Sequence, residues 1–534
     1  MTTPRNKINS LHQIIVLSSW CATRTQILSR LHTKLVATFR PAPTTVSDIL
    51  LGHDPEGSIL KNTLNNTSSW LDVKSTGFDF VDKSNMSLMT DFYELTMCAS
   101  YFQNKRNEAA TFDLFIRKLP PNRSYFIFAG LEQTLLFLEN IRFSQDQISY
   151  LRTKRLREDF LEYLKRFKFT GDVWSVPEGT TVFPDEPLIR VTAPIIEAQL
   201  VETFILNTVN LQTMIATKAS RVVLAAQGKP VIEFGLRRTQ GTDAGMKAAR
   251  CSYIAGASGT SNVLAGMKHG IPVFGTMAHS YVMSFDHEID AFRTFAKAFP
   301  ENSTLLIDTY DDLKGAENAA IVALELQEKG QKLSGVRLDS GDLVNLSIKV
   351  RHILDVHGLQ YVKIFASGDL DEYAIEDLTK KGAKIDAFGV GTRMSTSSDR
   401  PYVDVVYKLS GKVERGVFVP AMKLSKGKIT LPGKKQIFRK RNSEGKYLKD
   451  IIGLENEKVN GEPLLVKVME KGRITYDVPG LEEIRRVTLR NLLQLPDKYK
   501  KLTGAALYPV ELSPALRKIT NQLEKQLRRE GYSA

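Results

Sequence analysis

Apolar positions follow an α+β pattern from Met86 to about residue 225. In SLMTDFYELTM they recur at helical spacing, with Ser87 as a possible N-cap. Strand-like and helical runs then alternate with Pro-punctuated segments. The expected strands cover residues 110–116, 125–129 and 179–192, and the expected helices cover residues 133–139 and 156–167.

A second pattern, of short β-rich runs alternating with helical stretches, extends from Lys229 to about Leu409. The runs cover residues 230–234, 271–275, 304–308, 334–339, 361–367, 385–389 and 403–407. They recur at roughly the thirty-residue pitch of a βαβ unit, which predicts parallel strands. Helices are expected at 316–329 and 343–357, each followed by a glycine. Seven such units in succession predict a closed or nearly closed α/β barrel, and an open doubly wound sheet is the alternative that periodicity does not reject.

Polar and Gly-rich segments follow most of the expected barrel strands. They read EFGLRRTQG, GTMAHS, DTYDD, RLDSGD, SGDLDE and GVGTR. In a parallel barrel the carboxyl ends of the strands meet on one face, where active sites form. The sequence therefore predicts an active site built from these six segments.

The composition of the strand ends indicates an anionic, phosphorylated substrate. Glycine turns bring backbone N–H groups close to phosphate, and guanidinium groups bind phosphates or carboxylates through paired donors. The residues of these two kinds are Gly389, Gly391 and Thr392, and Arg237, Arg238, Arg337 and Arg393. Any one of these glycines taken alone is read as an ordinary turn.

Acidic residues and one histidine complete the predicted chemistry. Asp339, Asp342 and Asp369 are candidates to hold ribose hydroxyls or Mg²⁺ on pyrophosphate. A second acidic group comprises Asp308, Asp311 and Asp312. Capping of a helix explains at least one of them equally well. His279 is either a structural residue or a nucleophile or base, and the pattern alone does not separate these roles.

Charge is distributed unevenly along the 534-residue chain. The formal net charge is +14, with 37 Lys/Arg against 39 Asp/Glu at 86–410 and 27 against 14 at 411–534. The densest run, Lys434 to Arg441, is interpreted as a solvated basic face or a rim that attracts anionic substrates, in preference to a nuclear signal or nucleic-acid patch.

The remaining composition bears on membrane insertion, on cysteine chemistry and on targeting. No apolar run approaches the ~20 residues of a membrane span. The cysteines, Cys21, Cys98 and Cys251, show neither disulfide nor zinc spacing and suit a reducing compartment. Residues 1–47 lack Asp and Glu, as mitochondrial transit peptides do, so we expect a cytoplasmic protein with mitochondrial import as the alternative; a dispensable extension explains the composition equally well.

The ordered motifs resemble the nicotinate phosphoribosyltransferase family. They are LMTDFYELTM, KLPPNRSY, FIFAGLEQTLLFLE, EFGLRRTQG, GTSNVLAG, GTMAHSYVMSF, VRLDSGDL, FASGDLDEY, FGVGTR and TLPGKKQIFR, and they extend from about Met86 almost to the C-terminus. The resemblance implies a type II phosphoribosyltransferase α/β barrel with an additional α+β domain formed from N- and C-terminal segments. The implied ranges are an extension (1–85), the N-terminal part of that domain (86–225), the barrel (226–410) and a basic segment completing the domain (411–534).

The resemblance also implies the reaction. Nicotinate would react with 5-phosphoribosyl 1-pyrophosphate, with Mg²⁺ or Mn²⁺ and with ATP as co-substrate, in a homodimer that binds neither nucleic acid nor membrane. His279 would be transiently phosphorylated by ATP, beside Asp339. Nicotinate contacts would come from Tyr93, Thr276, Arg337 and Arg237, and phosphoribosyl pyrophosphate contacts from Thr392, Gly391, Gly368 and Asp369.

Selectivity and alternatives follow from the same resemblance. Ser261 stands where the related nicotinamide enzyme looks to carry an aspartate, and its lack of charge favours nicotinate over nicotinamide. A related enzyme acting on nicotinamide or quinolinate is the nearest rival. A ligand sensor or nucleic-acid-binding protein using the basic C-terminal segment is the rival from another class.

Overall fold

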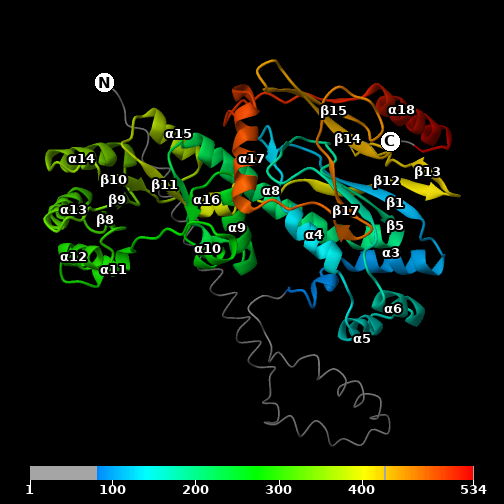
Figure 1. Cartoon of the computed structure of the whole chain (residues 1–534), viewed down its shortest axis with the longest axis horizontal. Helices are drawn as coiled ribbons and strands as arrows, with labels where there is room; N and C mark the ends of the chain where they lie inside the picture. Colours follow the sequence, from blue (N-terminus) through cyan, green and yellow to red (C-terminus); the bar gives the residue numbers. More distant parts are fainter. Residues whose placement is uncertain (1–80, 426–427, 533–534) are drawn as a thin grey trace, which may run out of the picture. The chain divides into compact units, whose positions relative to one another are not determined.

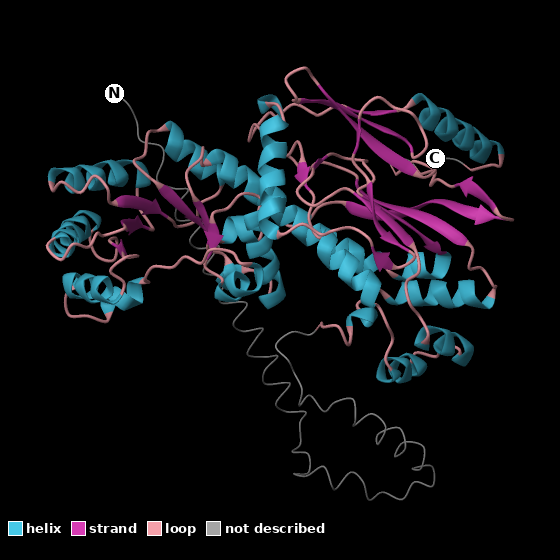
Figure 2. Ribbon diagram, viewed as in Figure 1, coloured by secondary structure: helices cyan, strands magenta, loops and turns pink. Residues whose placement is uncertain are grey.

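The computed structural model describes residues 81–425 and 428–532, so residues 1–80 of the expected extension, with their targeting interpretation, lie outside the described residues. The described chain is α/β and contains two large sheets, one antiparallel and one parallel (Figures 1 and 2). None of its helices combines the length and the apolar character that crossing a membrane requires.

The antiparallel sheet joins the two ends of the chain. Its seven strands lie in the order β13-β12-β1-β5-β3-β17-β18. The N-terminal segment contributes β1 (Ala109–Ile116), β3 (Asp172–Ser175) and β5 (Ile189–Pro194), and the C-terminal segment contributes β12 (Val405–Glu414), β13 (Val417–Pro420), β17 (Val466–Glu470) and β18 (Arg473–Ile474). The expected α+β domain made from both ends of the chain is therefore confirmed.

Shorter sheets and helices complete this domain. A four-stranded sheet contains β14 (Lys435–Arg441), β15 (Tyr447–Leu454), β16 (Glu462–Pro463) and β19 (Val510–Leu512), and a two-stranded sheet contains β2 (Phe126–Ile127) and β4 (Thr181–Val182). The helices are η4 (Met86–Leu88), α3 (Phe92–Gln103), α4 (Leu131–Asn140), α5 (Gln145–Thr153), α6 (Glu158–Lys165), α7 (Ile195–Leu200), α17 (Leu481–Gln494), η6 (Asp497–Tyr499) and α18 (Pro514–Arg529).

The first predicted helix begins later than expected. Its first residue is Phe92, after Asp91 at the N-cap position. Ser87 lies instead in the short helix η4, where its hydroxyl donates to Gln147 Oε1 at 2.9 Å. The predicted Ser87 cap is wrong because this buried hydroxyl finds a partner 60 residues away in the sequence.

The parallel sheet forms the barrel region. Its order is β7-β6-β11-β10-β9-β8, and every neighbouring pair is parallel. The strands are β6 (Val231–Glu233), β7 (Gly259–Thr260), β8 (Thr304–Leu306), β9 (Gly335–Leu338), β10 (Lys363–Ala366) and β11 (Ala387–Val390). One further parallel bridge joins Thr260 to Val273. Among the described residues no ladder joins Val273 to β8, so the barrel is open at one seam.

Helices connect and cover these strands (Figure 2). They are α8 (Glu202–Ala225), η5 (Leu236–Arg238), α9 (Thr242–Ile254), α10 (Val263–His269), α11 (His279–Met283), α12 (Glu288–Ala298), α13 (Asp312–Gln327), α14 (Leu343–Val356), α15 (Glu372–Lys380) and α16 (Thr392–Ser395). The helices expected at 316–329 and 343–357 are α13 and α14, and Gly330 and Gly358 follow them with φ of +72° and +73°.

Two of the expected barrel strands differ in the structure. The run at 271–275 makes only the single bridge at Val273. The run at 403–407 enters β12, which pairs antiparallel with β1 in the other sheet and crosses the expected boundary at residue 410. Strand pairing depends on contacts between distant segments, and the local apolar pattern of 403–407 does not specify its partner.

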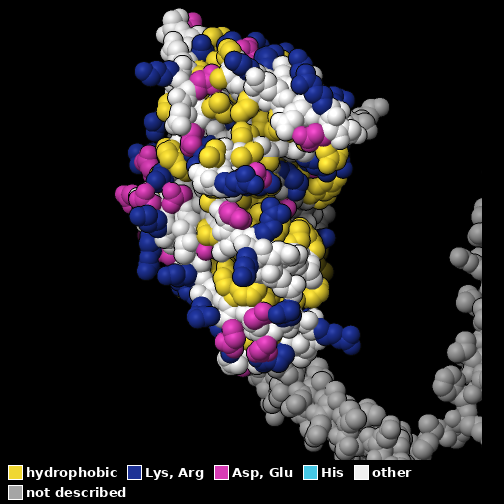
Figure 3. Space-filling view, turned by 90° about the vertical axis from the view of Figure 1, so that its right-hand side faces the viewer, with side chains coloured by type: hydrophobic (Ala, Val, Ile, Leu, Met, Phe, Trp, Pro, Cys, Tyr) yellow, Lys and Arg dark blue, Asp and Glu magenta, His cyan; other side chains and the backbone are white. Residues whose placement is uncertain are grey.

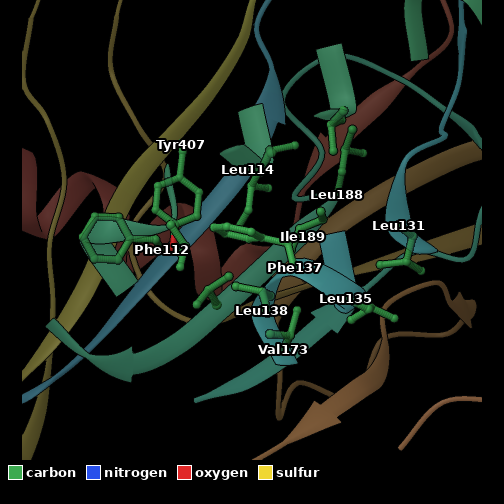
Figure 4. Close-up of a cluster of buried hydrophobic side chains, with 14 of the residues drawn as sticks. Phe112, Leu114, Leu131, Leu135, Phe137, Leu138, Val173, Leu188, Ile189 and Tyr407 are labelled. Atoms are coloured by element: carbon green, nitrogen blue, oxygen red, sulfur yellow. The ribbon is translucent and has the colours of Figure 1, made fainter. Parts of the chain in front are cut away.

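The longest helix of the described residues, α8, belongs to two hydrophobic cores. Its Ile205 and Val209 pack in the core of the α+β domain, while its Ala219 and Val222 pack in the core of the barrel. Figure 4 shows part of the first core, where Phe112 of β1 stacks on Tyr407 of β12 with ring centroids 4.9 Å apart. Full burial of a large apolar side chain contributes about 1.5–3 kcal/mol, so these contacts join the two chain ends firmly.

The densest basic run is strand β14, and much of it is buried. Lys435 pairs with Asp113 at 2.7 Å, Arg439 with Asp450 at 2.6 Å, and Arg441 with Glu462 at 2.7 Å. The expected solvated basic face is therefore wrong for Lys435 to Arg439, whereas Lys434, Lys440 and Arg441 are partly exposed. On the face shown in Figure 3, Lys and Arg side chains are interspersed with acidic and apolar ones and form no single basic patch.

Candidate active site

Arg337, on β9, joins three of the strand ends that the sequence singles out. Its Nη1 donates to Thr276 Oγ1 at 2.8 Å and to the Met277 carbonyl at 3.1 Å. Its Nε donates to Ser367 Oγ at 2.9 Å. Because guanidinium donors lie in one rigid plane, this side chain fixes the GTMAHS, RLDSGD and SGDLDE segments relative to one another.

Asp339 is the carboxylate at the centre of this cluster. Its Oδ1 accepts from Arg337 Nη2 at 2.9 Å and from the Ser367 hydroxyl. Burial acts to raise the pKa of Asp339, but the Ser367 hydrogen bond and the Arg337 guanidinium outweigh it and hold that pKa below its usual value. Asp339 is therefore an ionised acceptor at neutral pH.

His279 is the first residue of α11 and faces the same cluster. Its Nδ1 lies 3.2 Å from Thr309 Oγ1, and its Nε2 lies 4.0 Å from Asp339 Oδ2. The side chain is 43% exposed. The imidazole is thus held by a hydroxyl and faces a carboxylate while remaining open to a reagent from solution, an arrangement suited to a nucleophile.

The acidic group at 308–312 divides into different roles. Asp308 Oδ2 accepts from the Asp339 backbone N–H at 2.8 Å and from Ser340 Oγ at 2.9 Å. Asp311 caps α13 by accepting from the Leu313 and Lys314 N–H groups. Asp308 thus supports the Asp339 turn, and a structural cap accounts for Asp311.

Asp342 has a similar structural explanation. Its carboxylate accepts from the Asn345 N–H at 3.2 Å and from Asn345 Nδ2 at 2.6 Å, which caps α14. Of the three acids first considered for ribose or metal, Asp339 and Asp369 lie with the other strand-end residues, and Asp342 begins a helix.

Arg393 clamps the SGDLDE segment. Its Nε and Nη2 donate to Asp369 at 3.0 and 2.6 Å, and its Nη1 donates to Asp371 at 3.0 Å. The Arg393 hydrogen bond is the main cause that lowers the pKa of Asp369. Arg393 thereby holds the GVGTR segment, to which it belongs, against the SGDLDE segment. Its guanidinium donors are largely occupied by protein carboxylates.

Gly368 is required by its surroundings. Its φ is +89°, and a Cβ there would lie 1.8 Å from the Asp339 carbonyl oxygen. Asp369 also has a positive φ of +44°. The close approach of Gly368 to Asp339 places the SGDLDE turn directly against the RLDSGD turn.

Of the remaining candidates on the barrel, Thr392, Arg237 and Arg238 are exposed and Gly391 is half-buried, whereas Gly389 is buried within β11 and does not form a turn. Thr392 opens α16 directly after Gly391, and Arg237 and Arg238 lie in η5. These are accessible positions for an anionic ligand at the same strand ends.

Comparison with known proteins gives the family. Three models match in succession: the nicotinate phosphoribosyltransferase N-terminal domain at residues 88–210, the nicotinate phosphoribosyltransferase family at 230–451 and its C-terminal domain at 458–520. A nicotinate phosphoribosyltransferase (pncB2) of Mycobacterium tuberculosis is 46% identical over 431 residues, covering 80% of this chain and 91% of the relative. The chain belongs to the nicotinate phosphoribosyltransferase family.

A further relative and two solved structures are similar to this chain over most of their own length. The Bacillus subtilis protein is 39% identical over 85% of this chain and 99% of its own length. The structure of human nicotinic acid phosphoribosyltransferase superposes with a TM-score of 0.73 at 31% identity, covering 81% of this chain and 99% of that one. The nicotinate-nucleotide pyrophosphorylase structure from Pyrococcus furiosus gives 0.64 at 27% identity, covering 78% and 99%.

Tyr93 lies apart from the strand ends of this family member. It is on α3, in the α+β domain, and is 50% exposed. The next residue, Glu94, is buried and accepts from Gln199 Nε2 at 2.8 Å. Burial raises the pKa of Glu94 to about 7, against the lowering effect of the Tyr93 and Gln199 hydrogen bonds.

The described chain does not supply a complete metal site by itself. No group of three or more His, Cys, Asp or Glu side chains within the described residues is arranged to hold a metal ion. Asp308 nevertheless has one buried oxygen, Oδ1, without a hydrogen-bond partner. Asp308 and Asp339 fit Mg²⁺ as hard oxygen donors, because this ion commonly takes one or two carboxylates and completes its shell with substrate phosphates and water.

Three residues of the site escaped the sequence analysis. Ser367 and Thr309 lie inside two recognised motifs but look like ordinary strand-end hydroxyls. Glu233 is the first residue of the recognised EFGLRRTQG segment but was not singled out, because it ends an apolar β run. A polar residue within a buried strand is the signal that could have identified Glu233.

Proposed function

We propose that the chain transfers the 5-phosphoribosyl group from phosphoribosyl pyrophosphate to nicotinate, giving nicotinate mononucleotide and pyrophosphate, as the first step of NAD synthesis from nicotinate. Family membership supports this reaction. The observation that carries it is the Arg337–Asp339–His279 cluster at the strand ends. A ligand sensor would have no need of an exposed histidine oriented toward an ionised carboxylate.

The chemistry is displacement at C1 of ribose. The nicotinate ring nitrogen forms the C–N bond with its own lone pair, pyrophosphate departs with the electrons of the broken C–O bond, and no general base is required. The protein therefore acts by positioning and by stabilising charge. Arg237 and Arg337 would bind anionic groups of the substrates, while Gly391, Thr392, Gly368 and Asp369 would contact the phosphoribosyl moiety.

We propose that Mg²⁺, or Mn²⁺, is held by Asp308 and Asp339 together with the substrate pyrophosphate. When bound, the ion would neutralise charge on the leaving group. The free Asp308 Oδ1 and the ionised state of Asp339 support this assignment.

ATP coupling is proposed to run through His279. A ring nitrogen would take the γ-phosphoryl group, breaking its bond to ADP and forming a P–N bond, and water would later release inorganic phosphate. The exposure of His279 and its contact with Thr309 support this role. Two negative charges placed beside Arg337 would alter how the site holds pyrophosphate.

A homodimer is proposed because an apolar patch is exposed beside the site. The patch comprises Val263, Leu264, Met267, Val273 and Phe274. It is continuous, since a Cβ on Gly266 of α10 would meet the Val273 side chain at 2.2 Å. A second copy would cover this patch and bring Tyr93 of the partner subunit to the nicotinate site.

We propose a cytosolic location, with mitochondrial import as the alternative. A fluorescent fusion to the C-terminus of the full chain, compared with the same fusion to residues 81–534, tests it. Cytosolic signal from both supports the proposal. Mitochondrial signal from the full chain alone supports import.

Product formation is the direct test of the activity. Nicotinate or nicotinamide would be incubated with phosphoribosyl pyrophosphate and Mg²⁺, each with and without ATP. We expect mononucleotide from nicotinate, enhanced by ATP, and little from nicotinamide because Ser261 provides no carboxylate for an amide. Absence of product from either base would refute the proposal, and DNA binding would then be measured across a range of salt concentrations.

A further inference from the structure

Glu233 is a buried carboxylate at the end of β6 that holds three separate segments. It is 1% exposed. Its Oε1 accepts from the Gly235 N–H and from Ser395 Oγ, the latter at 2.6 Å. Its Oε2 accepts from Thr260 Oγ1 at 2.6 Å. One side chain thus contacts the turn after β6, the last residue of β7 and the helix after β11.

The carboxyl oxygens of Glu233 are hydrogen-bonded by uncharged donors. Within the described part of the chain no Lys, Arg or His forms an ion pair with it. A buried carboxylate is costly unless hydrogen bonds replace its lost hydration. Negative charge beside a site for anionic substrates also opposes their binding. These costs indicate that the hydrogen bonds themselves are the contribution of Glu233.

The hydrogen bond to Thr260, called the Thr260 arm below, connects Glu233 to the base-binding side. Thr260 Oγ1 also accepts from the Asn262 N–H at 3.0 Å, and Asn262 caps α10. Ser261, the position expected to select for nicotinate, lies between them. The Phe274 N–H donates to the Thr260 carbonyl at 2.9 Å, which connects this arm to the segment that carries Thr276.

The Ser395 arm leads to the phosphate-binding side. Ser395 ends α16, the four-residue helix whose first residue is Thr392. It is 1% exposed and packs against Gly235, where a Cβ would lie 2.0 Å from Ser395 Oγ. The third arm, the hydrogen bond from the Gly235 N–H, fixes the start of η5, the short helix that contains Arg237. Phosphate and base contacts therefore share one anchor.

We propose that Glu233 is a positioning residue that sets the spacing between the nicotinate-binding and phosphoribosyl-binding segments of the barrel. This inference rests on the proposed function. Glu233 acts through Thr260 on the base side and through Ser395 on the phosphate side. Displacing either hydroxyl shifts one half of the site against the other.

The test separates the two arms. Steady-state KM values for nicotinate and for phosphoribosyl pyrophosphate would be measured for Ser395→Ala and Thr260→Val. Ser395→Ala is expected to raise the KM for phosphoribosyl pyrophosphate about tenfold, equivalent to about 1.4 kcal/mol, with the nicotinate KM changed less than about twofold. Thr260→Val is expected to show the opposite split.

Two variants of Glu233 distinguish hydrogen bonding from charge. Glu233→Gln keeps an oxygen for Gly235 and Ser395, and its amide can donate to Thr260 Oγ1, so most activity should remain. Glu233→Ala should raise both KM values. Ser347→Ala is the matched control, because Ser347 is a buried serine on α14 of the same barrel, bonded to Val344 and Lys384.

Each outcome decides the inference. Equal shifts of both KM values in Ser395→Ala and Thr260→Val, matched by a lower unfolding temperature, would show a merely structural role and overturn it. A large loss of kcat in Glu233→Gln with unchanged KM values would assign the effect to charge and also overturn it. Wild-type protein in the same assay separates a failure of this inference from a failure of the proposed function, since absence of product from wild type refutes the proposed function itself.

Discussion

Single side chains at the strand ends contact several segments at once. Arg337 bonds Thr276, Ser367 and Asp339, and Asp339 in turn faces His279. Loss of one such residue therefore changes more than one contact, and the informative variants are those that remove a reacting group while leaving this frame intact.

His279→Ala is expected to abolish ATP hydrolysis and its coupling to transfer while leaving slow uncoupled transfer. The reason is that His279 carries the proposed phosphoryl acceptor, whereas the proposed substrate contacts of Arg337 do not depend on His279. Release of inorganic phosphate from ATP and formation of mononucleotide would be measured together. His352→Ala, at an exposed histidine on α14, is the control. Unchanged ATP turnover in His279→Ala would remove His279 from the mechanism.

Gly368→Ala is expected to lower kcat/KM by about a hundredfold or more, because the new Cβ would collide with the Asp339 carbonyl and displace the turn. Gly330→Ala is the matched control. Gly330 also has a positive φ, of +72°, but a Cβ there meets no atom within 4 Å. Its cost should be limited to about 1 kcal/mol of backbone strain with normal activity. Equal loss of activity in both variants would contradict the steric argument.

The sequence analysis named candidate residues at the strand ends but not the residues that hold them in place. Arg337, Asp339 and His279 were named because each lies at or near the end of an expected strand, and the roles of His279 and Gly368 came from the family resemblance. Ser367, Thr309 and Glu233 were missed because their partners are set by the folded sheet. Pairing across distant segments also explains the misassigned run at 403–407, whose Val405 pairs with Ile116.

At the level of elements, buried polar contacts fasten the small four-stranded sheet to the rest of the α+β domain. Arg439 of β14 pairs with Asp450 of β15 and donates to the Thr181 carbonyl of β4. Glu186, fully buried in the segment after β4, accepts from the Phe183 N–H at 2.8 Å. Burial and the neighbouring Asp450 raise the pKa of Glu186 well above its usual value of 4.5.

This raised pKa predicts a pH-dependent stability. Since the folded protein holds the Glu186 proton more tightly than the unfolded chain, its contribution is complete below the unfolded pKa and is lost as pH rises through the folded pKa. Glu186→Gln, which imitates the protonated acid, should remove this loss and raise the unfolding temperature at pH 8 relative to wild type. Thermal unfolding between pH 5 and 9 measures it. Glu511→Gln, at an exposed pair with Lys449, should keep the wild-type profile. The same profile in Glu186→Gln would refute the assignment.

At the level of the whole molecule, the site as proposed needs a second chain. The apolar patch of Val263, Leu264, Met267, Val273 and Phe274 lies on the barrel, whereas Tyr93 lies on the other domain. A dimer that covers the patch would account for both observations.

Met267→Glu is expected to produce monomers with little activity, because a charge at this 77% exposed position would have to be buried on association. Sedimentation analysis and the nicotinate assay on the same samples measure both effects. Val356→Glu introduces the same charge at a 69% exposed position on α14 and should leave a fully active dimer. A Met267→Glu protein that stays dimeric would place the interface elsewhere.

The sheet that joins the two ends of the chain has a consequence for synthesis. Leu409 of β12 pairs with Phe112 of β1 and follows it in the sequence by 297 residues. At a translation rate of about 5–20 residues per second, β1 waits roughly 15–60 s on the ribosome with one edge open. An open edge can join another nascent chain. Ribosome-associated chaperones that shield this edge, and lower growth temperatures, should therefore determine how much of the protein is recovered in native form.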